Sequence, residues 1–409
     1  MMIFVARKMR SILCLSFLLC MIAMKPETAR ANGFETWVAN FWPTAQAAGI
    51  SRATFDRAFA GVQPDPEVIR LANRQPEFSK PIWEYLSSAV SQNRIENGIA
   101  KIKENAAWLD TIEKRYGVSK YIIVAIWGME SSYGAVLENK RVVRPTIRSL
   151  ATLAYQGGPR TDFGREQLIA ALQILERGDV SPDRMYGSWA GAMGHTQFIP
   201  TTYNSYAVDA DGDGRRNIWG SIPDALASTA NYLKASGWRS GETWGYEVAL
   251  PQGFDYALAD ESTERTVQEW VNLGIRRTRG RAFPRANDIA TLILPAGSRG
   301  PAFLMLGNFS AIKTYNNSTS YAMGVGHLAD RLLGVQPFER AWPVNDTPLS
   351  RTQVEEMQTL LTQKGFSTGG VDGRVGPMTR SAVRTYQRSV GLTPDGYPTL
   401  ALLTRLRSS

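Results

Sequence analysis

The sequence predicts a mainly α-helical protein with a small inserted β-sheet subdomain and a separate helical module at its carboxyl end. Three observations support this fold class. Apolar residues recur at helical spacing through most of residues 34–235, and short β-prone runs separated by Gly and Pro fill about residues 241–310. Three prolines then mark a linker at residues 337–349, after which helical spacing returns. A chain of 409 residues is long enough for two or three such domains.

The first 31 residues (1–31) have the pattern of a secretory signal peptide. Three basic residues precede an apolar run at residues 12–24, and the sequence Ala-Arg-Ala at 29–31 fits a cleavage site. The run is shorter than the roughly 20 residues that span a bilayer. We therefore expect a periplasmic mature protein without a transmembrane segment. Cys20 lacks the small preceding residue of a lipidated cysteine, so we expect no lipoprotein anchor there.

Composition narrows the functions that the exported chain could have. Both cysteines lie within residues 1–31, so core packing alone must hold the mature fold. His195 and His327 are far apart in sequence and are better explained by packing or hydrogen bonding than by a metal site. The net charge is +9, and about +5 of it lies after residue 31. This excess suits peptidoglycan, nucleic acid or a membrane surface, and export argues against nucleic acid. We expect a monomer.

Turn residues divide the long helical region. We expect its helices to break at Pro64, Gly117, Gly134, Gly157-Gly158 and Pro182. Three β-prone runs then predict strands, and helical spacing predicts one more helix. The strands are expected at residues 246–250, 290–294 and 302–306, and the helix at about residues 320–333. The pattern therefore predicts one domain over residues 32–336 with a β-rich insertion.

Residues 350–409 predict a compact module of three helices. The first helix opens on Ser350 and Gln353, which fit a capping box, and it stops at Gly365. The second helix starts at Pro377 and ends before Gly391. No catalytic constellation stands out in this module.

Glu130 is the candidate catalytic residue. It lies near the end of an apolar run at residues 119–134, and Ile123 and Trp127 share its helical face. Such neighbours disfavour the charged form, which raises the pKa of a carboxyl group toward the value that a general acid needs. On spacing alone the alternative stays open that Glu130 ends a helix and points to solvent.

Residues 209–215 have the pattern of a metal-binding loop. Asp209, Asp211 and Asp213 occupy positions 1, 3 and 5 of an EF-hand, and the backbone carbonyl of Arg215 occupies position 7. Gly220 stands where the usual glutamate would be. The pattern predicts a structural calcium ion, and the alternative is an Asp/Gly-rich turn that binds no ion tightly.

Four sequence blocks resemble the membrane-bound lytic murein transglycosylase B family. In family order they are residues 130–134, 187–200, 209–219 and 315–321, and the resemblance covers about residues 34–335. The C-terminal module is similar to the type 1 peptidoglycan-binding domain. The matching residues include Gly365-Phe366, Val371-Asp372-Gly373, Gly376-Pro377, Tyr386-Gln387 and Gly391-Leu392. Together the two resemblances cover nearly the whole mature chain.

The resemblance implies a lysozyme-like α-helical core and non-hydrolytic cleavage of peptidoglycan between N-acetylmuramic acid and N-acetylglucosamine. The product would carry a 1,6-anhydromuramic end. Glu130 matches the family's catalytic acid, which then acts as base, while the substrate's acetamido group replaces the second carboxylate that glycosidases usually need. No cofactor is implied for this chemistry. The rival functions are a hydrolytic muramidase and a non-catalytic peptidoglycan-binding scaffold.

The same matching implies the residues that bind substrate. Ser188 would bond near the acetamido group or the catalytic glutamate, and Gln197 would contact sugar. Arg160 would bind the stem peptide, although Thr161 follows it where relatives have a second arginine. Asp224 is the candidate that closes the calcium loop, one residue beyond the family's spacing. The remaining cleft residues would be Tyr232, Tyr315, Asn316 and Tyr321.

Overall fold

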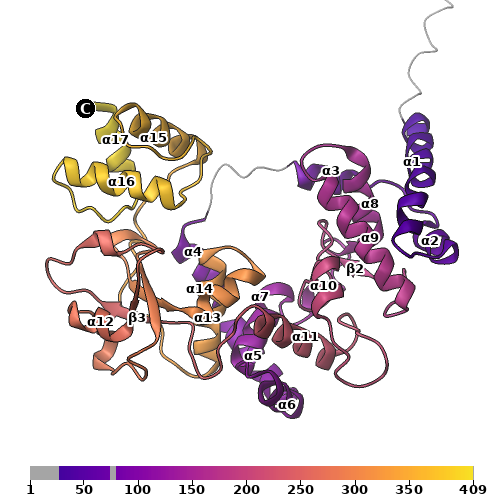
Figure 1. Cartoon of the computed structure of the whole chain (residues 1–409), viewed down its shortest axis with the longest axis horizontal. Coiled ribbons are helices and arrows are strands. Elements are labelled where there is room, and N and C mark those ends of the chain that lie inside the picture. The colour runs from indigo at the N-terminus through magenta and orange to yellow at the C-terminus, as the bar shows by residue number, and fades with distance from the viewer. Residues whose placement is uncertain (1–26, 74–79, 409) are drawn as a thin grey trace, which may run out of the picture.

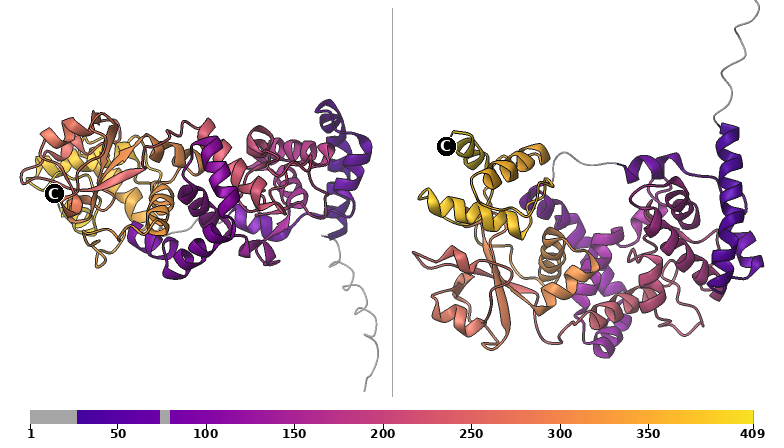
Figure 2. Two further views of the ribbon diagram at one scale, coloured as in Figure 1. Left: turned by 90° about the horizontal axis from the view of Figure 1, so that it is seen from below. Right: turned by 45° about the horizontal axis from the view of Figure 1, so that its top comes forward.

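The computed structural model describes residues 27–73 and 80–408, which form an elongated molecule (Figure 1). The amino-terminal helices lie at one end, and the sheet and the C-terminal module lie at the other, as two further views show (Figure 2). Residues 1–26 of the predicted signal peptide, including Cys20, lie outside the described residues. No helix in the described ranges is long and apolar enough to cross a membrane.

An amino-terminal lobe combines helices that are distant in sequence. They are α1 (Glu27–Ala47), α2 (Arg52–Phe59), α3 (Pro66–Ala72), α8 (Thr146–Gln156), α9 (Thr161–Arg177) and α10 (Pro200–Tyr206). Their shared core includes Phe34, Leu150 and Leu172, all at most 1% exposed. α9 ends at Gly178, whose φ of 78° is a left-handed cap that glycine adopts without strain.

A central lobe holds the helix that carries Glu130. Its helices are α4 (Ile82–Ala89), α5 (Gln92–Glu104), α6 (Ala106–Tyr116), α7 (Lys120–Ser131), α11 (Ile222–Ala235), α13 (Gly307–Tyr315) and α14 (Thr319–Leu332). All residues from Ile122 to Gly128 are buried, because α7 is apolar on every side and its neighbours enclose it. The predicted helix at residues 320–333 is confirmed as α14.

The β-rich insertion is an antiparallel sheet of five strands in the order β4-β6-β7-β3-β5. β3 (Gly245–Ala249), β6 (Ile289–Ile293) and β7 (Ala302–Leu306) confirm the three predicted runs. β7 is the central strand and is buried throughout, with Leu304 opposite both Tyr246 and Leu292. Three shorter elements were not predicted, namely β4 (Glu264–Thr266), α12 (Val267–Asn272) and β5 (Arg276–Arg277).

The C-terminal module consists of α15 (Arg351–Gln363), α16 (Pro377–Ser389) and α17 (Leu400–Ser408), as the sequence predicted. The capping box of Ser350 and Gln353 is present in both directions. The module contacts the β-rich part directly, because the hydroxyl and backbone N–H of Ser298 both donate to Asp395. Residues 337–349 also lie against that part, where the ring of Phe338 lies 4.8 Å from that of Phe303 on β7, and Phe338 stacks on His327 of α14 as well. The C-terminal module is therefore packed against the β-rich part.

Candidate active site

Glu130 occupies the penultimate position of α7, beside residues that are fully buried. Trp127 and Ile123 are at most 1% exposed, while the Glu130 side chain keeps partial access to solvent. Burial raises the pKa of Glu130 to about 7, and a hydrogen bond from Tyr321 opposes the rise. The Tyr321 hydroxyl donates to Glu130 Oε1 at 2.5 Å. A carboxyl group with this pKa is suited to both giving and taking a proton at neutral pH.

Tyrosines from three helices form a cluster that reaches this carboxyl group. Tyr321 lies on α14 and Tyr315 at the end of α13. Burial and the nearby charge of Glu130 raise the pKa of Tyr315 well above its usual value. The Tyr315 hydroxyl donates to the Thr196 carbonyl at 2.5 Å, and its ring lies 5.4 Å from that of Tyr232 on α11. The Tyr232 hydroxyl donates to the Thr314 carbonyl at 2.8 Å. The structure thus brings the three predicted tyrosines together on one side of Glu130.

The segment 187–200 folds back on itself next to the end of α7. The Ser188 hydroxyl accepts the backbone N–H groups of Ala190 and Ala192 at 3.2 and 3.1 Å, so it stabilises its own turn. The Gln197 amide donates to the Gly194 carbonyl at 2.9 Å. Two bonds attach the segment to α7, because Trp127 Nε1 donates to His195 Nδ1 and the Ser131 hydroxyl donates to the His195 carbonyl. As predicted, His195 serves hydrogen bonding and packing.

The turn after α7 and the neighbouring segment 187–200 contain residues in strained backbone conformations. Ser132, Tyr133 and Gln197 have φ values of 50°, 61° and 53°, a region that non-glycine residues seldom adopt. Gly134 follows directly with a φ of 94°, and a Cβ there would lie 2.5 Å from His195 Cε1. Such strain costs of order 1–3 kcal/mol per residue and is typical of functional sites. The turn after Glu130 is therefore fixed in a conformation that packing must maintain.

Tyr85 is a site residue that the sequence analysis missed. It lies on α4, where burial and, second, the negative charge of nearby Glu130 raise the pKa of its hydroxyl group. A Cβ at Gly324 of α14 would lie 3.2 Å from the Tyr85 ring, so the two helices meet closely there. Only the three-dimensional packing of α4 against α14 reveals this neighbour of Glu130.

Asn316 and Arg160 lie nearer the surface. Asn316 is exposed at the end of α13, directly after Tyr315. The Arg160 guanidinium lies 5.1 Å from the ring of Trp189, so it is linked to the segment that carries Ser188. Arg160 also lines a cleft of about 880 Å³ between the helical lobes and the C-terminal module, which Thr319 and Arg374 line as well. These two residues thus lie at the margin of the site.

The acidic loop forms the expected group of three carboxylates. Oxygens of Asp209, Asp211 and Asp213 lie within 4.8 Å of one another. Asp209 accepts the backbone N–H of Gly212 at 2.7 Å, and Asp213 accepts that of Arg215 at 2.8 Å. Carboxylate oxygens at this separation are ligands that calcium prefers, so the loop fits the ion.

Asp224, the residue predicted to close the calcium loop, lies apart from the three clustered carboxylates. This residue is fully buried and is not in the group of three carboxylates. One oxygen accepts the N–H of Ala210 at 2.7 Å, and the other accepts the N–H of Asn217 at 2.8 Å. Asp224 lies in the first turn of α11 beneath the loop, and its carboxylate binds loop backbone, so its role in closing the ion site stays a prediction.

The comparisons with known proteins establish the class. The chain matches the family described as the transglycosylase SLT domain over residues 33–330, and the peptidoglycan binding domain family over residues 350–406. The chain belongs to the SLT transglycosylase family. It is a peptidoglycan lytic transglycosylase with a helical, lysozyme-like fold, and it carries a C-terminal peptidoglycan-binding domain.

Individual relatives agree with this class. The chain is 30% identical to membrane-bound lytic murein transglycosylase B of Escherichia coli, over 68% of this chain and 78% of the relative. It is 53% identical to SltB3 from Pseudomonas aeruginosa, solved in complex with NAG-anhNAM-pentapeptide, with a TM-score of 0.88 over 91% of this chain and 99% of that one. Escherichia coli Slt35, solved in complex with calcium, is 26% identical with a TM-score of 0.61, over 76% of this chain and 95% of that one.

Proposed function

We propose that Glu130 alone supplies the acid and base of a non-hydrolytic cleavage. The Glu130 carboxyl group donates its proton to the glycosidic oxygen as the bond between that oxygen and C1 of N-acetylmuramic acid breaks. The oxygen of the 2-acetamido group attacks C1 and forms an oxazolinium ring. The Glu130 carboxylate then removes the proton of the 6-hydroxyl, whose oxygen attacks C1 and expels the acetamido oxygen. The proton returns to Glu130, and no water is consumed.

The observation that carries this proposal is the surroundings of Glu130. Its pKa of about 7 lies between those of a strong acid and a strong base, so one group can act in both steps. Its hydrogen-bonding partner is a tyrosine hydroxyl, and Tyr85 and Tyr315 are the other titratable neighbours that sense its charge. A retaining glycosidase would need a second carboxylate about 5–5.5 Å away. Substrate assistance takes the place of that group.

The neighbouring residues would orient the sugar. Gln197 and Asn316 offer amide groups to sugar hydroxyls, and the tyrosine rings cover the apolar sugar faces. Ser188 holds the turn whose backbone lies beside the acetamido group, since its hydroxyl already accepts two N–H groups. Arg160 would pair with a carboxylate of the stem peptide, as its exposed position in the large cleft allows.

The chain would divide into a signal peptide (1–31), a catalytic domain (32–336), a linker (337–349) and a wall-binding module (350–409). The separate hydrophobic core of the C-terminal module supports the boundary between the catalytic domain and that module. The location would be periplasmic and the protein monomeric, with peptidoglycan strands and stem peptides as partners. A calcium ion held by Asp209, Asp211, Asp213 and the Arg215 carbonyl would stabilise the loop without entering the chemistry.

Digestion of purified sacculi in ¹⁸O-labelled water tests the mechanism. The wild-type protein should release muropeptides with the mass of 1,6-anhydromuramic ends and without ¹⁸O, because no water attacks C1. A hydrolytic muramidase would instead yield reducing ends that carry one ¹⁸O atom. Release of labelled reducing ends as the main product would overturn the proposal.

A further inference from the structure

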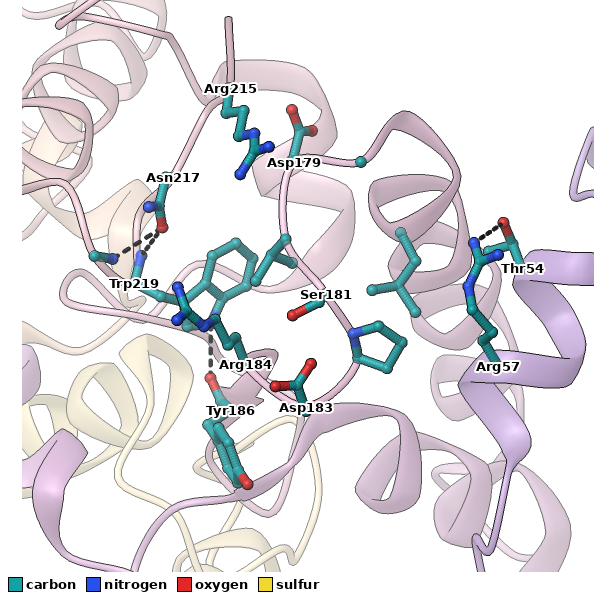
Figure 3. A pocket seen from close by; sticks show the side chains of 15 residues that line it. Thr54, Arg57, Asp179, Ser181, Asp183, Arg184, Tyr186, Arg215, Asn217 and Trp219 are labelled. Atoms are coloured by element: carbon teal, nitrogen blue, oxygen red, sulfur yellow. Dashed lines mark hydrogen bonds between the residues drawn. The ribbon is translucent and has the colours of Figure 1, made fainter. Parts of the chain in front are cut away.

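We infer that a second pocket, remote from Glu130, binds the free carboxylates of a stem peptide; this inference rests on the proposed function, which supplies that peptide. The pocket has a volume of about 740 Å³, which lies in the range of ligand sites. Four segments line it: α2, the end of α9, residues 178–186 and residues 215–220 (Figure 3). Glu130 and the cleft tyrosines are not among its lining residues.

Arginines give the pocket its positive charge. Arg57, Arg184 and Arg215 line it, and none of the three forms an ion pair with a described residue. Figure 3 shows Arg57 on α2 at one side of the pocket, with Arg184, Arg215 and Trp219 at the other. Guanidinium groups bind carboxylates through paired N–H donors. Because Arg57 comes from α2 and the other two from separate loop segments, the pocket could hold a ligand with more than one carboxylate.

The acidic residues of the pocket do not cancel this charge. Asp179 is only 7% exposed at its side chain and pairs with Arg177 at 3.1 Å and Arg216 at 2.9 Å. Asp183 is exposed, and its hydrogen bond with Ser181 lowers its pKa. One exposed carboxylate thus faces three guanidinium groups that form no ion pair with a described residue, of which Arg57 also donates to the Thr54 hydroxyl at 3.1 Å and Arg184 lowers the pKa of Asp183. The excess attracts an anion, while Asp183 would favour a ligand that also carries an amine.

The rest of the lining suits an aliphatic peptide. The Trp219 indole is held in place because its Nε1 donates to the Tyr186 carbonyl at 2.9 Å. Tyr186 leaves 41% of its surface exposed, and Leu175 and Pro182 add apolar wall. Flat rings and short apolar side chains give contact area to alanine-like residues at low entropic cost. A nucleic acid would instead need a longer basic track.

The pocket lies behind the segment that borders the active site. Tyr186 directly precedes residues 187–200, and the Trp219 backbone bonds the ring of His195. Nδ1 of the same His195 ring accepts the indole N–H of Trp127 on α7. A peptide held there would fix the polymer against the same rigid segment that shapes the cleft, without touching the reacting atoms.

Calorimetric titration of the mature protein with the free stem pentapeptide, which lacks sugar, tests the inference. Arg184→Gln should raise the dissociation constant about tenfold, since it removes a charged hydrogen-bonding partner of the peptide. Arg57→Gln should raise the dissociation constant by a smaller factor, and Arg184→Lys should bind more tightly than Arg184→Gln. Arg281→Gln, a charge-matched change on the exposed surface of the β-rich part, should leave it unchanged. Melting temperatures would show that each variant folds.

Three outcomes would overturn the inference. The wild-type protein would give no binding heat, or Arg184→Gln and Arg57→Gln would bind the pentapeptide as tightly as wild type. Equal affinity for a pentapeptide whose carboxylates are all amidated would also contradict it. The proposed function is read separately, from the products that wild type releases from sacculi. Either conclusion can therefore fail while the other stands.

Discussion

Glu130 and the aspartates of the acidic loop are both carboxyl groups close to the surface, yet their surroundings suit them to different chemistry. Glu130 ends a helix that is buried on every side, and its pKa rises to about 7. Asp211 and Asp213 lie in an exposed loop, where carboxylate oxygens gather within 4.8 Å. Burial favours a group that exchanges a proton, while a solvated cluster favours cation binding. The contrast teaches that position in the fold, not residue type, decides the role.

The largest expected effect comes from removing the acid. Glu130→Gln keeps the shape of the side chain but cannot donate or accept the proton, so the rate should fall about 10³-fold, within the range for general acid–base catalysis. The measurement is release of anhydro-muropeptides from sacculi. Glu138→Gln is the matched control, because Glu138 is exposed just beyond the same turn. If the Glu130→Gln variant released anhydro-muropeptides at a rate within tenfold of wild type, Glu130 would not be the proton-exchanging group, and its contrast with the acidic loop would be lost.

The pH dependence should show one ionisation rather than two. The resting enzyme needs Glu130 protonated, so kcat/KM should be constant below about pH 7 and fall about tenfold for each pH unit above it. A pair of catalytic carboxylates would instead give a bell-shaped profile. If kcat/KM also fell below pH 6 while the protein stayed folded, a second catalytic group would have to be present.

Much of this contrast could be predicted from the sequence, and the exceptions have physical causes. Local pattern predicted the helical character of residues 34–235, the helix at about residues 320–333, the first two helices of the C-terminal module and the three long strands, because those features depend on nearby residues. The short strands β4 and β5 depend on pairing with distant strands, which local pattern does not encode. Tyr85 escaped notice because only the packing of α4 on α14 brings it to Glu130. The backbone bonds of Asp224 could not be predicted either, because they depend on how the loop folds over α11.

Tyr321→Phe should have a moderate effect on the rate and should shift the pKa of Glu130. The Tyr321 hydroxyl donates to Glu130 and so stabilises the ionised form, which lowers the pKa. Without it the pKa rises further, and the descending limb of the kcat/KM profile should move to higher pH. The rate at pH 6 should fall about tenfold, because the base step loses a charged hydrogen bond. A rate loss with an unmoved limb would mean that Tyr321 only packs against the cleft.

The smallest effect concerns the acidic loop and should appear in stability alone. Millimolar calcium should raise the melting temperature of the wild-type protein by about 2–4 °C, because an ion that binds only the folded state stabilises it by mass action. Asp211→Asn should abolish this rise, since it removes one of the three clustered carboxylates, while anhydro-muropeptide release in the absence of calcium stays unchanged. Magnesium is the matched control ion and should act weakly, because it demands a tighter octahedral shell. Equal shifts for both ions in wild type and Asp211→Asn would show that the loop is a turn without a specific site, and the acidic loop would then differ from Glu130 in exposure alone.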